Sequence, residues 1–221
     1  MRNGNLRQHL SDRILNEELT WDKRYKIIKG ICLGLDYLHD HDPPIIHMDL
    51  KPENILLDDN MNPKIADFGQ SRVLARDKTQ TKAKKIGGTR GYMPPEFMKD
   101  GIISKEFDIF SFGVVIIEIV TGHKDYADME FSEFVEHVGK LIETMNCINR
   151  MKGHTSELEI NHQEIRNCIE IGLCCVDPKR TERPRIFKIA MMLDDPELVR
   201  SPSNKVHLII FLSLWISPRK E

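Results

Sequence analysis

The chain has 221 residues, a length that suits one domain of ordinary size or one large lobe of a bigger domain. Hydrophobic residues make up 40% and charged residues 30% of the sequence, which predicts a globular body with a real core. The 32 basic side chains nearly balance the 34 acidic ones, so no strong overall field favours nucleic acid or an anionic membrane. We therefore expect no nucleic-acid partner.

The chain ends and the cysteines give no sign of secretion or of a membrane span. Five cysteines without the spacing of a zinc site or a disulfide framework predict reduced thiols. The first ten residues lack the apolar stretch of a secretory signal, so the chain as given is expected in the cytoplasm. The apolar run VHLIIFLSLWI, residues 206–216, is well short of the ~20 residues that span a bilayer. It predicts a tail that is packed on the domain or disordered.

Helical periodicity begins after Thr20, a candidate N-cap residue. Apolar residues recur every three or four positions until HDHDPP, whose two prolines cannot continue a helix. Gly30 and Gly34 leave room on this helix for a close neighbour. Two short β-like pieces, residues 55–57 and 63–66, flank the turn-forming DDNMN and predict a small hairpin.

The second half of the chain is predicted to be mainly helical. Residues 70–90 are polar, basic and aperiodic, which is typical of an exposed mobile loop. Residues 108–120, DIFSFGVVIIEIV, are apolar on nearly all sides, so this helix is expected in the centre of the body. Further helices are expected around 131–145, 162–175 and 185–193. Residues 1–196 are predicted to form the domain and 197–221 a tail.

The polar residues of HMDLKPEN are placed for phosphate chemistry. Asp49 can accept or orient a hydroxyl proton, Lys51 can reach a transferred phosphate, and Asn54 can ligate magnesium. About a dozen residues later, Asp67 supplies the carboxylate that a hard cation prefers. One such motif alone is weak evidence. The ordered set, continued by a later Pro-Glu pair, predicts phosphoryl transfer.

The phrases LTWDKRYKIIKGICLGLDYLH, PENILLDDNMNPKIADFG and GGTRGYMPPEF resemble the protein kinase family, and within it the plant receptor-like kinases related to Pelle and to the interleukin-receptor-associated kinases. The resemblance runs from about Met1 to Leu193. It implies an α+β protein kinase-like fold, here the C-terminal lobe only, mainly α-helical with small β-hairpins around the catalytic loop. It also implies serine/threonine kinase activity, ATP and Mg as cofactors, and a protein substrate.

The resemblance assigns a role to each residue of the predicted site. It implies that Asp49 is the catalytic carboxylate and that Lys51 contacts the transferred phosphate. Asn54 and Asp67 match the magnesium ligands, and they also contribute to nucleotide binding through that metal. Leu56 matches the apolar residue that forms the floor of the adenine pocket. One short stretch of the chain is therefore expected to carry most of the chemistry.

Other matches concern the surroundings of this site. His47 and Phe68, the latter followed by Gly69, match two members of the hydrophobic stack that links the two kinase lobes. Thr89 matches the threonine near the catalytic aspartate that accompanies serine/threonine specificity. Met48 departs from the pattern, because many kinases have an arginine there that pairs with a phosphate on the activation loop. Phosphorylation of that loop is therefore not expected to order the site.

Three charged residues are expected to hold the lobe together. The resemblance implies that Glu96 pairs with Arg183 in a buried ion pair that fastens the substrate-docking loop. It further implies that Asp108, in the core helix, holds the catalytic loop. Gln70 and Phe110 stand where the family has leucine and tryptophan, and both changes are expected to be tolerated.

A complete kinase also has an upper lobe with a glycine-rich loop, a lysine and a glutamate. The opening MRNGNLRQHL is similar to the family's segment just past the hinge, so the upper lobe is expected to be missing and the chain inactive alone. A separate N-terminal lobe or a longer product would have to supply it. Two alternatives remain, a non-catalytic module that docks partners of full-length receptor-like kinases at the plasma membrane and a fragment that folds poorly.

Overall fold

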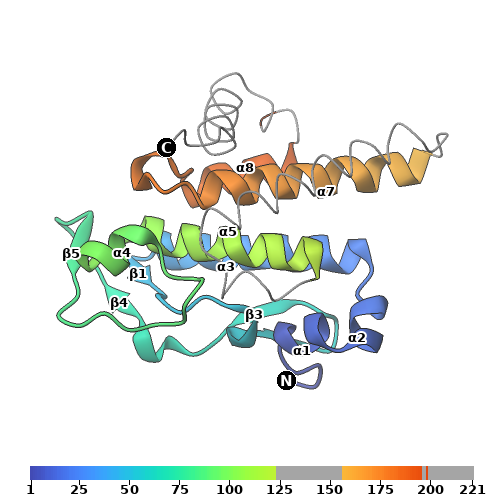
Figure 1. The fold of residues 1–221 in the computed structure, drawn as a ribbon, viewed down its shortest axis with the longest axis horizontal. Helices are drawn as coiled ribbons and strands as arrows, with labels where there is room; N and C mark the ends of the chain where they lie inside the picture. The colour runs from blue at the N-terminus through green and yellow to red at the C-terminus, as the bar shows by residue number, and fades with distance from the viewer. Residues whose placement is uncertain (123–155, 196–197, 199–221) are drawn as a thin grey trace, which may run out of the picture.

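The computed structural model describes residues 1–122, 156–195 and 198. α3 and α5 run side by side through the middle, α7 and α8 pack on one side of them, and α1, α2 and short strands lie on the other (Figure 1). The helices of the described part are α1 (Leu6–Ser11), α2 (Arg13–Glu18), α3 (Trp21–Asp40), α4 (Pro95–Asp100), α5 (Lys105–Thr121), α7 (Ser156–Cys175) and α8 (Ile186–Asp194). This mixed architecture agrees with the α+β class and the helical character that the sequence predicts.

The strands of the described part are short and pair two by two in antiparallel sheets. They are β1 (Ile45–Ile46) with β4 (Arg72–Val73), β2 (Ile55–Leu57) with β3 (Pro63–Ile65), and β5 (Gln80–Lys82) with β6 (Ile102–Ser104). The β2–β3 hairpin, in which Ile55 faces Ile65, confirms the predicted one. It brings the end of the HMDLKPEN motif back onto the strand that leads to Asp67.

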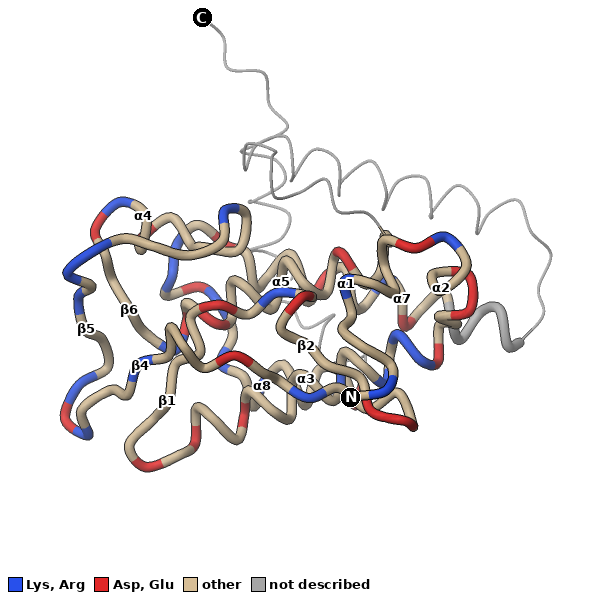
Figure 2. Tube along the Cα trace, turned by 90° about the horizontal axis from the view of Figure 1, so that it is seen from below, with Lys and Arg blue, Asp and Glu red and all other residues tan. Residues whose placement is uncertain are grey.

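The prediction of an aperiodic loop over residues 70–90 was incomplete, because the segment contains β4 and β5. Each of these strands pairs with a strand outside the segment, β4 with β1 and β5 with β6. Two-residue and three-residue strands are too short to leave a periodic pattern, and their partners are distant in the sequence. Most of the segment is exposed, and Lys and Arg recur along it in Figure 2.

α3 follows the predicted apolar periodicity and ends at Asp40, before the two prolines. Its apolar face is buried, with Ile28 and Leu35 fully covered. The expected cap is wrong in one respect, since Thr20 occupies the N-cap position but its side chain makes no capping hydrogen bond. Burial of the apolar face, rather than a strong cap, therefore stabilises this helix.

Two glycines let β3 lie directly on α3. A methyl group added at Gly30 would stand 2.4 Å from Cγ of Pro63, and one added at Gly34 would stand 2.9 Å from Cδ1 of Ile65. Both distances are shorter than any ordinary carbon contact. The close neighbour that the sequence predicts for these glycines is therefore the hairpin next to the HMDLKPEN motif.

α5 is the core helix that the sequence predicts, and every residue from Phe107 to Ile119 is buried. α7 and α8 cover two of the other predicted helical segments, although α7 begins six residues before the expected start. The helix expected at 131–145 and the tail at 197–221, apart from Leu198, lie outside the described residues. Of the helices that are described, none combines the length and the apolar character needed to cross a bilayer.

We expect Gly30→Ala to lower the free energy of unfolding by about 1–3 kcal/mol, because the new methyl group overlaps the Pro63 ring and α3 must move away from β3. Urea unfolding of the whole chain measures this loss. Gly87→Ala is the matched control, since a methyl group there meets nothing within 4 Å. Equal stability of the two variants would contradict the close approach.

Candidate active site

The catalytic-loop motif is anchored by one buried carboxylate. Asp108 lies in the first turn of α5 and is fully buried. Its Oδ2 accepts the backbone N–H of His47 at 2.8 Å and a ring nitrogen of His39 at 3.0 Å, and its Oδ1 accepts the backbone N–H of Met48 at 2.9 Å. Because a buried carboxylate requires such donors, the core helix fixes where the motif begins.

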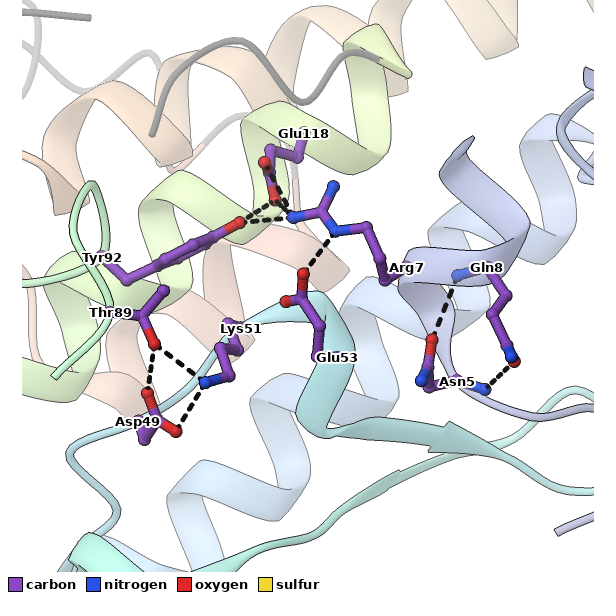
Figure 3. Close-up of polar contacts among 9 residues, drawn as sticks. All are labelled: Asn5, Arg7, Gln8, Asp49, Lys51, Glu53, Thr89, Tyr92 and Glu118. Carbon is purple, nitrogen blue, oxygen red and sulfur yellow. Dashed lines mark hydrogen bonds and ion pairs between the residues drawn. The ribbon is translucent and has the colours of Figure 1, made fainter. Parts of the chain in front are cut away.

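Asp49, Lys51 and Thr89 form one cluster in Figure 3. Asn54 joins this cluster through its bond to Asp49. Oδ1 of Asp49 accepts the Thr89 hydroxyl at 2.8 Å, while Oδ2 lies 2.8 Å from Nζ of Lys51 and accepts the Asn54 amide at 3.0 Å. Lys51 also donates to the Thr89 hydroxyl at 2.8 Å. The carboxylate is almost fully buried, so its orientation is fixed on both oxygens.

Asn54 and Asp67 are brought together by the β2–β3 hairpin. The backbone N–H of Ala66, next to Asp67, donates to the carbonyl of Asn54 at 2.9 Å. Asp67 has a left-handed backbone (φ 63°) and an exposed side chain. The side-chain amide of Asn54 donates to the carbonyl and the carboxylate of Asp49, so the side-chain oxygen of Asn54 is left to bind a cation. One carboxylate and one amide oxygen fit Mg²⁺, which completes its shell with phosphate and water. Within the described residues, no cluster of three His, Cys, Asp or Glu offers another metal site.

His47, Phe68 and Leu56 border the same site. The ring of His47 is buried and lies edge-on to Phe68, with ring centres 5.0 Å apart. The His47 ring also bridges the loop, because Nε2 contacts the carbonyl of Ala66 at 2.9 Å and Nδ1 accepts the N–H of Asp49 at 3.3 Å. Phe68 remains 45% exposed and Leu56 is half-buried, so both leave apolar surface open at the border of the site. Gly69 donates its N–H to Asp67 at 3.2 Å.

Met48 has a strained backbone conformation and a buried side chain. Its backbone is left-handed (φ 67°), which is costly for a residue with a side chain. The side chain is 5% exposed and belongs to a small apolar cluster, separate from the main core, with Ile46, Leu74, Phe97, Ile103 and Phe107. This cluster joins β1, the segment after β4, α4, β6 and α5. An apolar contact thus stands where the resemblance places an arginine.

Glu96 and Arg183 form the ion pair that the resemblance implies. The guanidinium of Arg183 makes two hydrogen bonds to the Glu96 carboxylate, at 2.7 and 2.8 Å. A third N–H reaches the carbonyl of Glu106 at 3.0 Å, and the guanidinium lies 5.0 Å from the Phe110 ring centre. A bidentate pair of this kind fixes orientation as well as distance, so α4 is held to the segment before α8.

Sequence reasoning missed a second polar cluster, which consists of Arg7, Glu53, Tyr92 and Glu118 (Figure 3). Nε of Arg7 donates to Glu53 at 2.7 Å, and Nη2 contacts the Tyr92 hydroxyl at 2.6 Å and Glu118 at 3.2 Å. The Tyr92 hydroxyl donates to Glu118 at 2.7 Å. The one available sign was Glu118 itself, a charged residue directly after the apolar residues 114–117 of α5.

Burial controls the ionisation of this second cluster. It raises the pKa of Glu118 from its ordinary value of 4.5 to about 7, although Arg7 and the Tyr92 hydroxyl act in the opposite direction. Burial, and then the charge of Glu118, also raise the pKa of Tyr92. For Arg7, burial alone would lower the pKa, but Glu118, Tyr92 and Glu53 together raise it. Arg7 therefore stays charged, while Glu118 titrates near neutral pH.

With this geometry in place, comparison with known proteins establishes the class. A family model for the protein kinase domain matches residues 1–193, so the chain belongs to the protein kinase family. The match agrees with the resemblance that the sequence motifs carry and with the fold class expected from them.

Similar proteins are plant receptor-like kinases. The receptor-like serine/threonine-protein kinase SD1-7 of Arabidopsis thaliana is 38% identical over 200 residues, 87% of this chain and 24% of that protein. The cysteine-rich receptor-like protein kinase 14 of the same plant is 41% identical over 86% of this chain and 30% of its own length. The cysteine-rich receptor-like protein kinase 6 of Oryza sativa subsp. japonica is 39% identical over 92% and 30%. The chain thus spans about a quarter to a third of the length of these relatives.

We expect Met48→Ala to cost about 2–4 kcal/mol of unfolding free energy, because it leaves a cavity in the small apolar cluster. Met48→Leu, which conserves volume, is the control and should cost about 1 kcal/mol. Urea unfolding measures both. If both variants kept the stability of the unmodified chain, the cluster would contribute nothing to holding these segments together.

We expect Glu118 to make stability fall as the pH rises. Between pH 4.5 and about 7 the folded chain keeps a proton that the unfolded chain has released, so the folded state is favoured on the acid side of this window. The difference in unfolding free energy between the unmodified chain and Glu118→Gln should therefore shift by about 3 kcal/mol from pH 4 to pH 8, to the disadvantage of the unmodified chain. Parallel pH profiles of the two proteins, measured by urea unfolding, would contradict the raised pKa.

Proposed function

We propose that this chain carries the catalytic and metal-binding half of a protein serine/threonine kinase. The observation that carries the proposal is the Asp49 carboxylate, almost fully buried and held by Lys51, Asn54 and Thr89. Asn54 is also bonded to Ala66, the residue before the exposed Asp67. In phosphoryl transfer the protein acts mainly by positioning the reactants and stabilising charge. The reaction needs an oriented carboxylate, positive charge at the phosphate and oxygen ligands for Mg²⁺.

In the proposed reaction a serine or threonine hydroxyl of a protein substrate attacks the γ-phosphorus of ATP. A new oxygen–phosphorus bond forms, the bond from the γ-phosphorus to the bridging oxygen breaks, and ADP leaves. Asp49 orients the hydroxyl and takes its proton, and Lys51, 2.8 Å from Asp49, neutralises charge on the transferred group. The Thr89 hydroxyl occupies Oδ1 of Asp49 in the resting arrangement, so the substrate hydroxyl would compete for this oxygen.

In this proposal Asn54 and Asp67 hold Mg²⁺, which supplies positive charge at the phosphates. Leu56 would then provide apolar surface for the adenine, while Phe68, edge-on to His47, would belong to the hydrophobic stack that links the two lobes. A kinase also needs a glycine-rich loop, a lysine and a glutamate from an upper lobe, which a longer product or a separate chain would supply. We infer that turnover requires that lobe and that this chain binds the metal and nucleotide weakly by itself.

A docking function without catalysis is the second candidate. It is favoured by the way residues 88–96 are fastened, because Glu96 bonds to Arg183 and Tyr92 to Arg7 and Glu118, and none of these contacts uses the metal ligands. A surface held in this way can bind a full-length receptor-like kinase without nucleotide. Binding retained in Asp49→Ala would support this candidate.

We expect the purified chain to bind Mg²⁺ and ATP together in a saturable way, and Asp67→Ala to weaken this binding at least tenfold, because it removes the one exposed carboxylate of the predicted metal site. Titration calorimetry is the measurement. Asp77→Ala is the matched control, since it removes another exposed carboxylate, on the segment between β4 and β5, without touching the site.

If a folded, monomeric chain shows no binding up to millimolar nucleotide, or if Asp67→Ala and Asp77→Ala behave alike, the metal assignment is wrong for this chain. Docking is then the remaining candidate. If binding follows the expected order, phosphoryl transfer to a protein substrate in the presence of a supplied upper lobe becomes the next measurement, with Asp49→Ala as the inactive reference.

A further inference from the structure

Arg7 connects three parts of the lobe that are far apart in the sequence. Its partners Glu53, Tyr92 and Glu118 are 46, 85 and 111 positions away. Glu53 lies in the catalytic-loop motif, Tyr92 in the segment before α4, and Glu118 in α5. In Figure 3 the guanidinium points from α1 into the space between the other three side chains.

The position of Arg7 on α1 is itself fixed. The side chain of Asn5 accepts the N–H of Gln8 at 3.1 Å, and the side chain of Gln8 accepts the N–H of Asn5 at 3.0 Å, which closes a capping box around the first turn. Leu6 and Leu10 on the same helix are buried. α1 is therefore a short helix held at its start and on its apolar face, with Arg7 between these two supports.

The surroundings of Arg7 restrict its side chain, and a lysine could not replace its contacts. The Arg7 side chain is 12% exposed and that of Glu118 is fully buried, so the polar atoms of both side chains bond to protein groups rather than to water. Oε2 of Glu53 is buried without a hydrogen-bond partner, which leaves Oε1 and its bond to Arg7 as the polar contact that holds this carboxylate. The planar guanidinium can bond to two carboxylates and a hydroxyl at once, whereas the ammonium group of a lysine is a single point charge.

Two of the residues that bond to Arg7, Glu53 and Tyr92, are close in the sequence to residues of the Asp49 cluster. Glu53 is two residues beyond Lys51 in the catalytic-loop motif. On the other side, the N–H of Tyr92 donates to the carbonyl of Thr89 at 3.3 Å, and its carbonyl accepts the hydroxyl of Ser111 at 2.7 Å. Arg7 thus bonds to Glu53, two residues after Lys51, and to Tyr92, three residues after Thr89. Lys51 and Thr89 are two of the three residues that hold the Asp49 carboxylate.

We propose that Arg7 is a positioning residue, which clamps the segment of residues 88–94 against the catalytic loop and so maintains the contact of Thr89 with Asp49 and Lys51. This role rests on the proposed phosphoryl transfer and concerns the same site. Without the guanidinium, Oε1 of Glu53 and the Glu118 carboxyl each lose a hydrogen-bond donor, and the Tyr92 hydroxyl loses its link to α1. The segment 88–94 then opens more often, while the helical core remains closed.

Hydrogen exchange of the whole chain, followed by mass spectrometry without nucleotide, tests the clamp. In Arg7→Met we expect the amides of residues 88–94 to exchange at least tenfold faster, with α3 and α5 unchanged. Arg24→Met is the matched control. Arg24 is also mostly buried, but its bonds go to Asn16 and to the carbonyls of Leu19 and Ile119, and none of these bonds reaches residues 47–54 or 88–94.

A second variant and a second readout keep the test decisive if Arg7→Met does not fold. Tyr92→Phe removes only the hydroxyl from a buried ring, and we expect it to speed exchange of residues 88–94 in the same direction. The methyl resonance of Thr89 reports its contact with Asp49 and Lys51 directly. We expect this resonance to shift in Arg7→Met and in Tyr92→Phe but to stay in place in Arg24→Met.

Unchanged exchange of residues 88–94 and an unchanged Thr89 resonance in folded Arg7→Met or Tyr92→Phe would overturn the proposal. The same changes in Arg24→Met would overturn it too, because they would then reflect general loosening. These readouts need no nucleotide, so they are independent of the calorimetric titration. Failure of Mg²⁺ and ATP to bind counts against the proposed kinase function, whereas failure of the exchange test counts against Arg7 alone.

Discussion

The site depends on the hydrogen bonds that the buried carboxylate of Asp108 accepts. An unpaired charge in the core would be very costly, so Asp108 must find donors, and it finds them in the backbone of residues 47 and 48 and in the ring of His39. These bonds hold Met48 in a left-handed conformation that its side chain disfavours. The direction of the chain as it enters Asp49 is therefore set from α5, which is the most deeply buried helix of the described part.

Two buried arginines in other parts of the lobe are also paired with carboxylates. Arg183 and Arg7 are both largely removed from water, and each is paired with carboxylates on other segments, Glu96 for the first, Glu53 and Glu118 for the second. Breaking a buried pair leaves an uncompensated charge, which costs about 3–5 kcal/mol. Such pairs add little net stability compared with apolar packing, but they specify geometry. In this lobe they fasten the segments on both sides of Thr89.

The sequence predicted the parts of the structure that are local. The Asp49, Lys51 and Asn54 cluster lies within six residues, the β2–β3 hairpin has its turn residues between its strands, and α3 and α5 show their burial in their apolar patterns. The ion pair of Glu96 with Arg183 came from the family resemblance, because 87 positions separate the two residues. The Arg7 network and strands β4 and β5 were missed, since each depends on partners that no local pattern identifies.

The two sides of the site differ in how they are held. Asp49 is enclosed, with both oxygens bonded to residues of the chain itself, whereas Asp67 and Phe68 are exposed and Leu56 is half-buried. In the proposed reaction the proton moves to Asp49, and preorganisation matters most there, because misplacing the carboxylate would raise the barrier directly. A metal ion and a nucleotide bring their own charge and apolar surface, so their side can remain open until they bind. In the proposed function the lobe thus holds its acid–base carboxylate by internal contacts, while the side assigned to the nucleotide is open.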